Sequence, residues 1–171
     1  MHSATPPPRR PIRIAVCGAS NGDRDLLAHA ETVGREIARH GAILICGGMG
    51  GVMEAAARGA HAEGGSTIGI LPGTRSLEAN PWISIPLPTG MGEGRNILVV
   101  RFADAVIAVG GEWGTLSEIA LAKRIGTPVI LFQPSLALHL PIEAATDARH
   151  AVQWAIEKAG SQAASESRGP Q

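Results

Sequence analysis

Three glycine-rich segments contain the residues of this chain best suited to bind a phosphorylated ligand. They are Gly18-Ala19-Ser20-Asn21-Gly22, Gly47-Gly48-Met49-Gly50-Gly51 and Gly110-Gly111-Glu112-Trp113-Gly114-Thr115. Glycine permits positive φ angles, and without a Cβ it lets a phosphate approach the backbone amides. The pattern predicts a phosphate-binding site whose candidate contacts are Gly18, Ser20, Gly47, Gly48, Gly50, Gly51, Gly110, Gly111, Gly114 and Thr115. The alternative is that these glycines serve only the geometry of turns after strands.

Arg95 and Glu118 are the charged residues that could act on such a ligand. Arg95 lies in TGMGEGRN, next to Asn96, and a guanidinium pairs well with a phosphate. A solvent-exposed surface arginine is the alternative for this position. Glu118 follows Thr115 by three residues, which is the spacing of a capping box, so a purely structural role at a helix start is open for this pair.

The elements that must position these residues alternate along the chain between short β-branched runs and helical patterns. Strands are expected at 12–18, 42–48, 66–73, 104–111 and 128–132, with a further short strand within 82–87. Helices are expected at 23–40, 51–63, 92–102, 115–125 and 147–159. The alternation predicts an α/β fold, a Rossmann-like doubly wound parallel sheet with helices on both faces. Loops that follow strands then meet at the carboxyl edge of the sheet, where we expect the three glycine segments and Arg95 to converge.

Composition limits the remaining possibilities. The 171 residues are 44% hydrophobic, which predicts one folded domain at 12–159 between disordered tails at 1–11 and 160–171. Fifteen basic residues balance 15 acidic ones, so nucleic-acid binding is not expected, and no apolar run is long enough for a membrane helix. Two cysteines and six scattered histidines predict a reducing cytoplasmic location and no metal site.

Stricter nucleotide-binding motifs do not occur in the sequence. Because GK[ST] is missing, a Walker-type ATPase is excluded. The first glycine segment is not GxGxxG and no acidic residue follows the second expected strand, which argues against an ordinary NAD site. Trp113 is expected either to stack on a bound heterocycle or to fill the core.

The segment GMGEGRN followed by ADAVIAVGGEWGTLSEIALA resembles the Lonely Guy family, whose bacterial relatives are often labelled lysine decarboxylases. The resemblance covers about residues 12–159, and the spacing from Arg95 to Glu118 matches that of an arginine and a glutamate in the family. Those two positions are implicated in hydrolysing the N-glycosidic bond of cytokinin nucleoside monophosphates. The resemblance therefore implies a nucleoside 5'-monophosphate phosphoribohydrolase with Arg95 and Glu118 as catalytic residues.

Two departures from the Lonely Guy pattern, together with several shorter matches, favour a related group of proteins. Glu112 stands where the phosphoribohydrolases have the second glycine of PGGxGT, and Asn96 stands where they usually carry lysine. GRN, AVGG and GTLSEIALA are similar to molybdenum-cofactor carrier-like proteins, which bind a phosphate-bearing pterin and are not known to need catalysis. We therefore expect a carrier that binds a nucleotide or the molybdenum cofactor, with the hydrolase as the alternative. By analogy a homo-oligomer, dimer or tetramer, is expected, and a DNA-processing module like the related DprA domain is disfavoured by the zero net charge.

Overall fold

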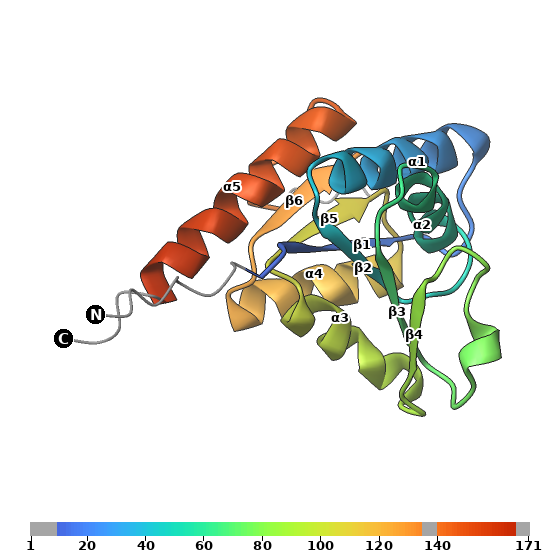
Figure 1. Ribbon diagram of the computed structural model, residues 1–171. Coiled ribbons are helices and arrows are strands. Elements are labelled where there is room, and N and C mark those ends of the chain that lie inside the picture. The colour runs from blue at the N-terminus through green and yellow to red at the C-terminus, as the bar shows by residue number, and fades with distance from the viewer. Residues whose placement is uncertain (1–9, 135–139, 167–171) are drawn as a thin grey trace, which may run out of the picture.

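The computed structural model describes residues 10–134 and 140–166, without the side chains of 163–166. In this part of the chain six parallel strands form one sheet, in the order β4-β3-β2-β1-β5-β6 (Figure 1). The strands are β1 (Arg13–Gly18), β2 (Ile43–Cys46), β3 (Thr67–Leu71), β4 (Ile85–Pro88), β5 (Ala105–Val109) and β6 (Val129–Phe132). The predicted α/β class with a doubly wound parallel sheet is confirmed.

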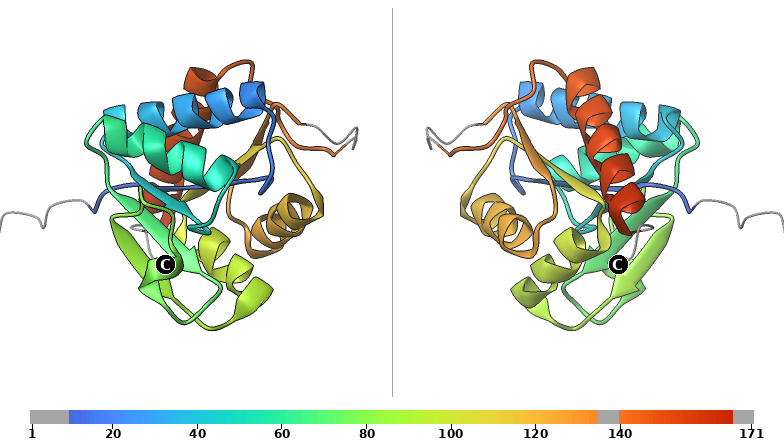
Figure 2. Two further views of the ribbon diagram at one scale, coloured as in Figure 1. Left: turned by 90° about the vertical axis from the view of Figure 1, so that its right-hand side faces the viewer. Right: turned by 90° about the vertical axis from the view of Figure 1, so that its left-hand side faces the viewer.

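Helices cover both faces of the sheet, as Figure 2 shows. They are α1 (Arg24–Arg39), α2 (Val52–Ala62) and α5 (Ala148–Glu166) on one face, and α3 (Asn96–Phe102) and α4 (Trp113–Ile125) on the other. Two 3₁₀ turns, η1 (Ser76–Glu78) and η2 (Gly92–Arg95), lie in the connections before β4 and α3. The strands are rich in alanine, valine, isoleucine and leucine because both sides of each central strand are buried, and β5 is buried at every residue.

The strand order places the switch point of the fold between β1 and β5. From β1 the chain moves outward through β2, β3 and β4, then returns to the other side of β1 as β5 and continues to β6. The loops after β1 and β5 therefore lead to helices on opposite faces of the sheet and leave a crevice between them. A ligand site is expected at the carboxyl ends of these two neighbouring strands.

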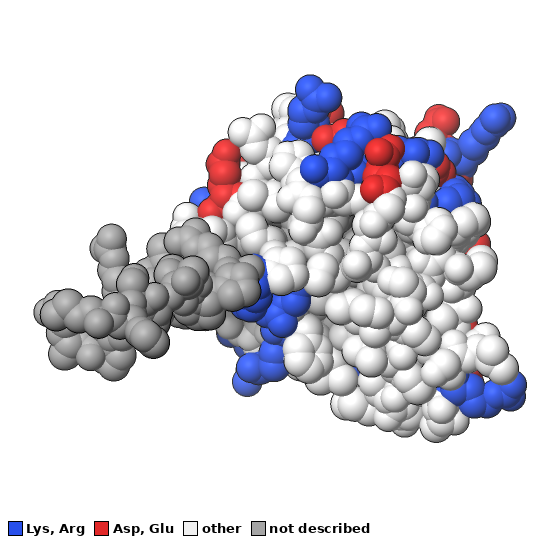
Figure 3. Space-filling model, viewed as in Figure 1, with Lys and Arg blue, Asp and Glu red and all other residues white. Residues whose placement is uncertain are grey.

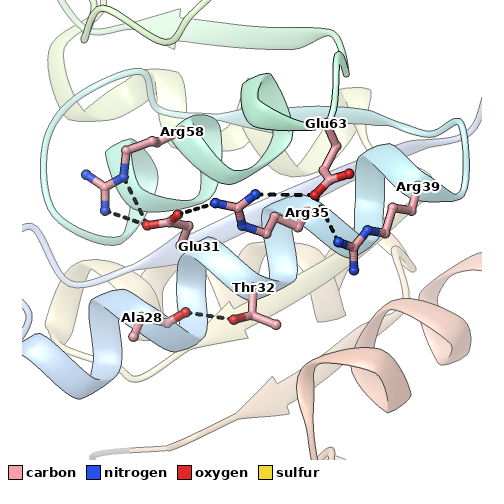
Figure 4. Close-up of polar contacts among 7 residues, drawn as sticks. All are labelled: Ala28, Glu31, Thr32, Arg35, Arg39, Arg58 and Glu63. Atoms are coloured by element: carbon pink, nitrogen blue, oxygen red, sulfur yellow. Dashed lines mark hydrogen bonds and ion pairs between the residues drawn. The ribbon is translucent and has the colours of Figure 1, made fainter.

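An ion-pair network ties α1 to α2 on the outer surface (Figure 4). The carboxylate of Glu31 accepts hydrogen bonds from Arg35 and Arg58, both at 2.8 Å. Glu63 accepts from Arg35 at 3.2 Å and from Arg39 at 2.9 Å. These guanidinium groups hold the pKa values of the Glu31 and Glu63 carboxyls below their ordinary range. Arg35 thus joins the two carboxylates into one chain of contacts across the helix pair.

Several element bounds differ from the sequence prediction. The short strand expected within 82–87 forms as β4, although it begins at Ile85. α4 begins at Trp113 and not at Thr115, and α5 continues to Glu166 into the segment 160–171 that was expected to be a disordered tail. Residues 1–9 and 167–171 of the predicted tails lie outside the described residues. Among the helices that are described, none is long and apolar enough to cross a membrane.

Candidate functional site

A pocket of about 330 Å³ opens at the carboxyl edge of the sheet, and we call it the carboxyl-edge pocket. Each of the three glycine-rich segments contributes to it, as do the start of α3 and the end of β3. The lining residues are Gly18, Ala19, Ser20, Met49, Met53, Pro72, Glu93, Arg95, Asn96, Glu112, Gly114, Thr115 and Glu118. The predicted candidates Gly18, Ser20, Arg95, Asn96, Gly114, Thr115 and Glu118 are therefore brought together, whereas Gly47, Gly48, Gly50, Gly51, Gly110 and Gly111 do not line this pocket.

The glycines that do not line the carboxyl-edge pocket are needed for the backbone conformation of the same loops. Gly51 has φ 68° and ψ −132°, a conformation that only glycine adopts without strain, and a Cβ there would collide with the carbonyl oxygens of Ala19 and Ser20. The amide of Val52 donates to the carbonyl of Ala19 at 3.0 Å, so the loops after β1 and β2 are packed against each other. Gly51 is therefore explained by the geometry of the turn. Gly48 and Gly110 also have positive φ angles, which glycine adopts readily, so the same explanation applies to them.

Asn80 braces the second glycine-rich loop from the opposite side. Its side-chain amide donates to the carbonyl of Met49 at 2.9 Å, and its backbone amide donates to the carbonyl of Gly48 at 2.9 Å. The loop that presents Met49 to the pocket is therefore fixed both by the loop after β1 and by the segment before β4.

Arg95 is a buried cation, so the alternative of a solvent-exposed arginine is wrong. The residue is only 6% exposed. Its Nε donates to the carbonyl of Ile70 at 2.8 Å, one Nη donates to the Asn96 side-chain oxygen, and the other donates to the carbonyl of Gly47 at 3.5 Å. No carboxylate among the described residues lies within ion-pair distance of this guanidinium. A buried cation whose hydrogen-bond acceptors are all neutral oxygens is stabilised when an anion enters the pocket beside it.

Glu118 projects from α4 into the same pocket and is 8% exposed. Burial raises the pKa of its carboxyl to about 7, although the positive charge of Arg95 and the neighbouring Cys17 thiol act in the opposite direction. The negative charge of Glu93 contributes a smaller upward effect. Burial, together with the neighbouring Glu118, also raises the pKa of the Cys17 thiol, so Cys17 stays protonated and able to donate.

The capping box predicted for Thr115 and Glu118 does not form. Because α4 begins at Trp113, Glu112 occupies the N-cap position in an extended conformation, and it makes no side-chain capping bond. Thr115 lies inside the first turn and is 2% exposed, and its hydroxyl has no hydrogen-bond partner within the described part of the chain. The first amides of α4 therefore face the pocket without a side-chain cap, next to a buried hydroxyl that is free to bond a ligand.

The rim of the pocket contains residues that the sequence analysis did not select. Glu93 lies two residues before Arg95, and Met49 lies within the second glycine segment. Their positions inside these motifs could have identified both as pocket residues. Pro72 directly follows β3, whose carboxyl end meets the same edge of the sheet. Trp113 is 81% exposed, so the alternative that it fills the core is wrong.

Solved structures with this fold include two molybdenum-cofactor proteins. The molybdenum cofactor binding protein from Rippkaea orientalis has a TM-score of 0.79 and 32% identity, and the alignment covers 86% of this chain and 97% of that one. The molybdenum cofactor carrier protein of Chlamydomonas reinhardtii has a TM-score of 0.77 and 32% identity, covering 88% and 99%. DNA processing protein A from Helicobacter pylori, at 19% identity and a TM-score of 0.65, shares the fold alone.

Sequence relatives include both uncharacterised and enzymatic proteins. An uncharacterised protein of Archaeoglobus fulgidus is 42% identical over 127 residues, covering 74% of this chain and 83% of that protein. The rice cytokinin riboside 5'-monophosphate phosphoribohydrolase LOG is 34% identical over 113 residues, which are 63% of this chain but only 46% of the rice protein. These similarities confirm the predicted relation to the Lonely Guy and molybdenum-cofactor carrier superfamily. With a family model matching residues 11–164, the chain belongs to the SLOG cluster4 family.

Proposed function

We propose that this protein binds a phosphate-bearing nucleotide or pterin in the carboxyl-edge pocket and carries it without chemical change. The observation that supports this most directly is the pair formed by Arg95, a buried cation without an ion-pair partner among the described residues, and Thr115, whose buried hydroxyl has no partner there. The uncapped first turn of α4 supplies backbone amides beside them. Together these groups provide a charge, a hydroxyl and amide donors for one phosphate.

The molybdenum cofactor fits this donor set as cargo. Its phosphate would lie at Arg95, Thr115 and the start of α4, and its pterin would lie toward Met49 and Met53, whose thioether side chains pack readily on ring systems. The volume of about 330 Å³ lies within the size range of small-molecule pockets. No catalytic cofactor is part of this proposal.

Native mass spectrometry of the purified chain tests the proposal. We expect an adduct whose mass matches a phosphorylated heterocycle and whose occupancy falls strongly in Arg95→Ala. That substitution should weaken binding by roughly 10- to 150-fold, as expected for a lost charge-assisted hydrogen bond. Protein without an adduct and without measurable affinity for nucleoside monophosphates or pterin phosphates would contradict it.

Hydrolysis of a nucleoside 5'-monophosphate is the second candidate, and the meeting of Glu118 with Arg95 in one pocket favours it. In this reaction Glu118 would act as the nucleophile or stabilise the oxocarbenium-like centre, while Arg95 would orient the ribose phosphate. Free base released from adenosine and cytokinin monophosphates is the measurement. Robust turnover by the wild type that disappears in Glu118→Gln would establish the hydrolase and overturn the carrier.

A homo-oligomer is also proposed, supported by apolar side chains on the edge strand β4. Ile85 and Leu87 are exposed and lie opposite Ile68 and Ile70, on the sheet face that α3 and α4 only partly cover. Figure 3 shows a broad surface over β3 and β4 without charged side chains. In light scattering, Leu87→Asp should lower the molecular mass, whereas Leu77→Asp, at another exposed leucine in η1, should not.

Location in a reducing cytoplasm completes the proposal. Both cysteines are free and buried, and their thiols contribute to packing rather than to a disulfide. Neither nucleic acid nor a membrane surface is proposed as a partner, because in Figure 3 positive and negative side chains are mixed along the upper part of the face and the separate positive groups form no continuous basic stripe.

A further inference from the structure

A second pocket of about 310 Å³ lies at the opposite edge of the sheet, and we call it the amino-edge pocket. It is bounded by the amino ends of β1 and β5 and by the carboxyl ends of α3 and α4. It shares no lining residue with the carboxyl-edge pocket and is nearly as large.

The charged side chains of the amino-edge pocket are three arginines and one carboxylate. Arg10, Arg13 and Arg101 come from three different segments, and Asp104 is the acidic residue among them. Asp104 accepts two hydrogen bonds from Arg10, each at 2.8 Å, and one from an Nη of Arg13 at 3.2 Å. The backbone amide of Arg13 donates to the same carboxylate at 2.8 Å. One carboxylate cannot neutralise three guanidinium groups, so the lining keeps a net positive charge.

Asp104 also fixes the geometry of the two arginines that it binds. With a longer contact from Nε of Arg13 at 3.5 Å, five donors surround its oxygens. The hydrogen bonds from Arg10 and Arg13 overcome its partial burial and lower its pKa to about 2. The carboxylate is therefore ionised throughout the physiological range. Guanidinium groups that are held in place lose little conformational freedom when an anion binds.

Arg101 is the cation that this arrangement leaves available. It lies in the last turn of α3, is exposed, and has no hydrogen bond or ion pair with any described residue. A cation at that position complements the helix dipole, and Lys123 and Arg124 do the same in the last turn of α4. That role accounts for the cations at the helix ends, but it does not explain why Arg10 and Arg13 add further positive charge from the strand side.

We propose that the amino-edge pocket is a second ligand site, which binds a small multiply charged phosphate anion through Arg101 and Arg13. The planar guanidinium matches phosphate oxygens with two parallel hydrogen bonds, and the concave shape suits a compact anion better than an extended strand. Thr127, which lines the pocket at the end of α4, adds a hydroxyl whose own proton is already donated to the carbonyl of Val100 at 3.2 Å. The recognition is therefore chiefly electrostatic and weakens as salt is added.

Backbone amide NMR with sodium pyrophosphate at low ionic strength tests the second site. We expect saturable shifts at the amides of Gly126 and Thr127 in the wild type, and an affinity roughly tenfold weaker by the same signals in Arg101→Gln. Arg101→Glu should abolish these shifts. The matched control is Arg149→Gln, an exposed arginine in α5 that lines neither pocket, and it should leave the affinity unchanged.

The same spectra separate this site from the proposed function. Any binding at the carboxyl-edge pocket is reported by the Gly114 amide and should not depend on Arg101. Unperturbed Gly126 and Thr127 signals, equal affinities in wild type and Arg101→Gln, or equal weakening in Arg149→Gln would overturn the second site. If the same signals showed a higher affinity for a short single-stranded DNA than for pyrophosphate, that result would also overturn the second site, in favour of a nucleic-acid surface.

Discussion

The thiol of Cys17, near the carboxyl end of β1, lies beside the carboxyl group of Glu118 in α4, and each group shifts the pKa of the other. The pair links an inner strand of the sheet to the helix whose first turn faces the pocket. The thiol favours the ionised carboxyl, as the charge of Arg95 does, yet burial is the larger effect and the pKa rises to about 7. Glu118 therefore changes its charge near neutral pH, inside a pocket that is proposed to hold an anion.

This titration predicts how stability depends on pH. The pKa of Glu118 is raised in the folded chain from an ordinary value of 4.5, so the stability that its neutral form contributes is complete below pH 4.5 and is lost as the pH rises through about 7. Glu118→Gln stays neutral. Its free energy of unfolding relative to wild type should rise by about 3 kcal/mol between pH 4.5 and 8. Urea denaturation at several pH values measures this, and parallel profiles would contradict it; Glu157→Gln, an exposed glutamate in α5, is the control.

Thr115 gives a test in which stability and binding move in opposite directions. Thr115→Val removes a buried hydroxyl that has no partner within the described residues and keeps the side-chain volume, so the free energy of unfolding should rise by about 1 kcal/mol. Affinity for adenosine monophosphate, measured by calorimetry, should fall by roughly five- to tenfold because one phosphate contact is lost. Thr115→Ser keeps the hydroxyl and should retain affinity. A variant that binds as tightly as wild type would remove Thr115 from the phosphate site.

Gly51 and Gly114 separate folding from binding. Gly51→Ala places a Cβ against the carbonyls of Ala19 and Ser20 at φ 68°, and it should cost at least about 2 kcal/mol of stability. Gly114 is helical with open space around its missing Cβ, so Gly114→Ala should leave the melting temperature unchanged or higher. Because Gly114 lines the pocket, the added methyl group should nevertheless weaken adenosine monophosphate binding. Equal melting temperatures for the two variants would be inconsistent with these backbone conformations.

The ion pairs between α1 and α2 predict a salt-dependent effect. Arg35→Gln removes the contacts to both Glu31 and Glu63, and it should lower the melting temperature at low ionic strength. The loss should shrink in 1 M salt, since the pairs are partly solvent-exposed and are screened there. Thermal denaturation at two salt concentrations measures the change. A loss that does not depend on salt would assign the role of Arg35 to packing of its aliphatic stem.

Most of the fold could be predicted from the sequence because a buried parallel strand has a strong local signature. Within the strand expected at 104–111, residues 105–109 are all apolar and form β5. Asp23, the first residue of the helix expected at 23–40, caps α1, and its carboxylate accepts from the amide of Leu26 at 2.8 Å. The end of α5 could not be predicted so well. The small residues around Gly160 carry no apolar pattern, although alanine favours a helix that is already started.

The site was predicted less completely because local spacing does not report burial. Thr115 and Glu118 satisfy a capping pattern, but the helix begins two positions earlier at Trp113, and this turns both side chains toward the crevice. Arg95 has no local feature that distinguishes it from a surface arginine. Its burial follows from the crossing of η2 over the carboxyl ends of β2 and β3, which only the tertiary fold supplies.

Because Gly51 seats the second glycine-rich loop on Ala19 and Ser20, and Asn80 holds that loop from the other side, the floor of the carboxyl-edge pocket is ordered when the chain folds. The entropy of arranging these loops is then lost during folding and not at the moment a ligand arrives. Ligand capture should accordingly proceed in one kinetic step, with an observed rate that rises linearly with ligand concentration and shows no plateau. The residence time of the ligand would then be determined by how quickly its phosphate leaves the guanidinium of Arg95, and not by the opening of a gate.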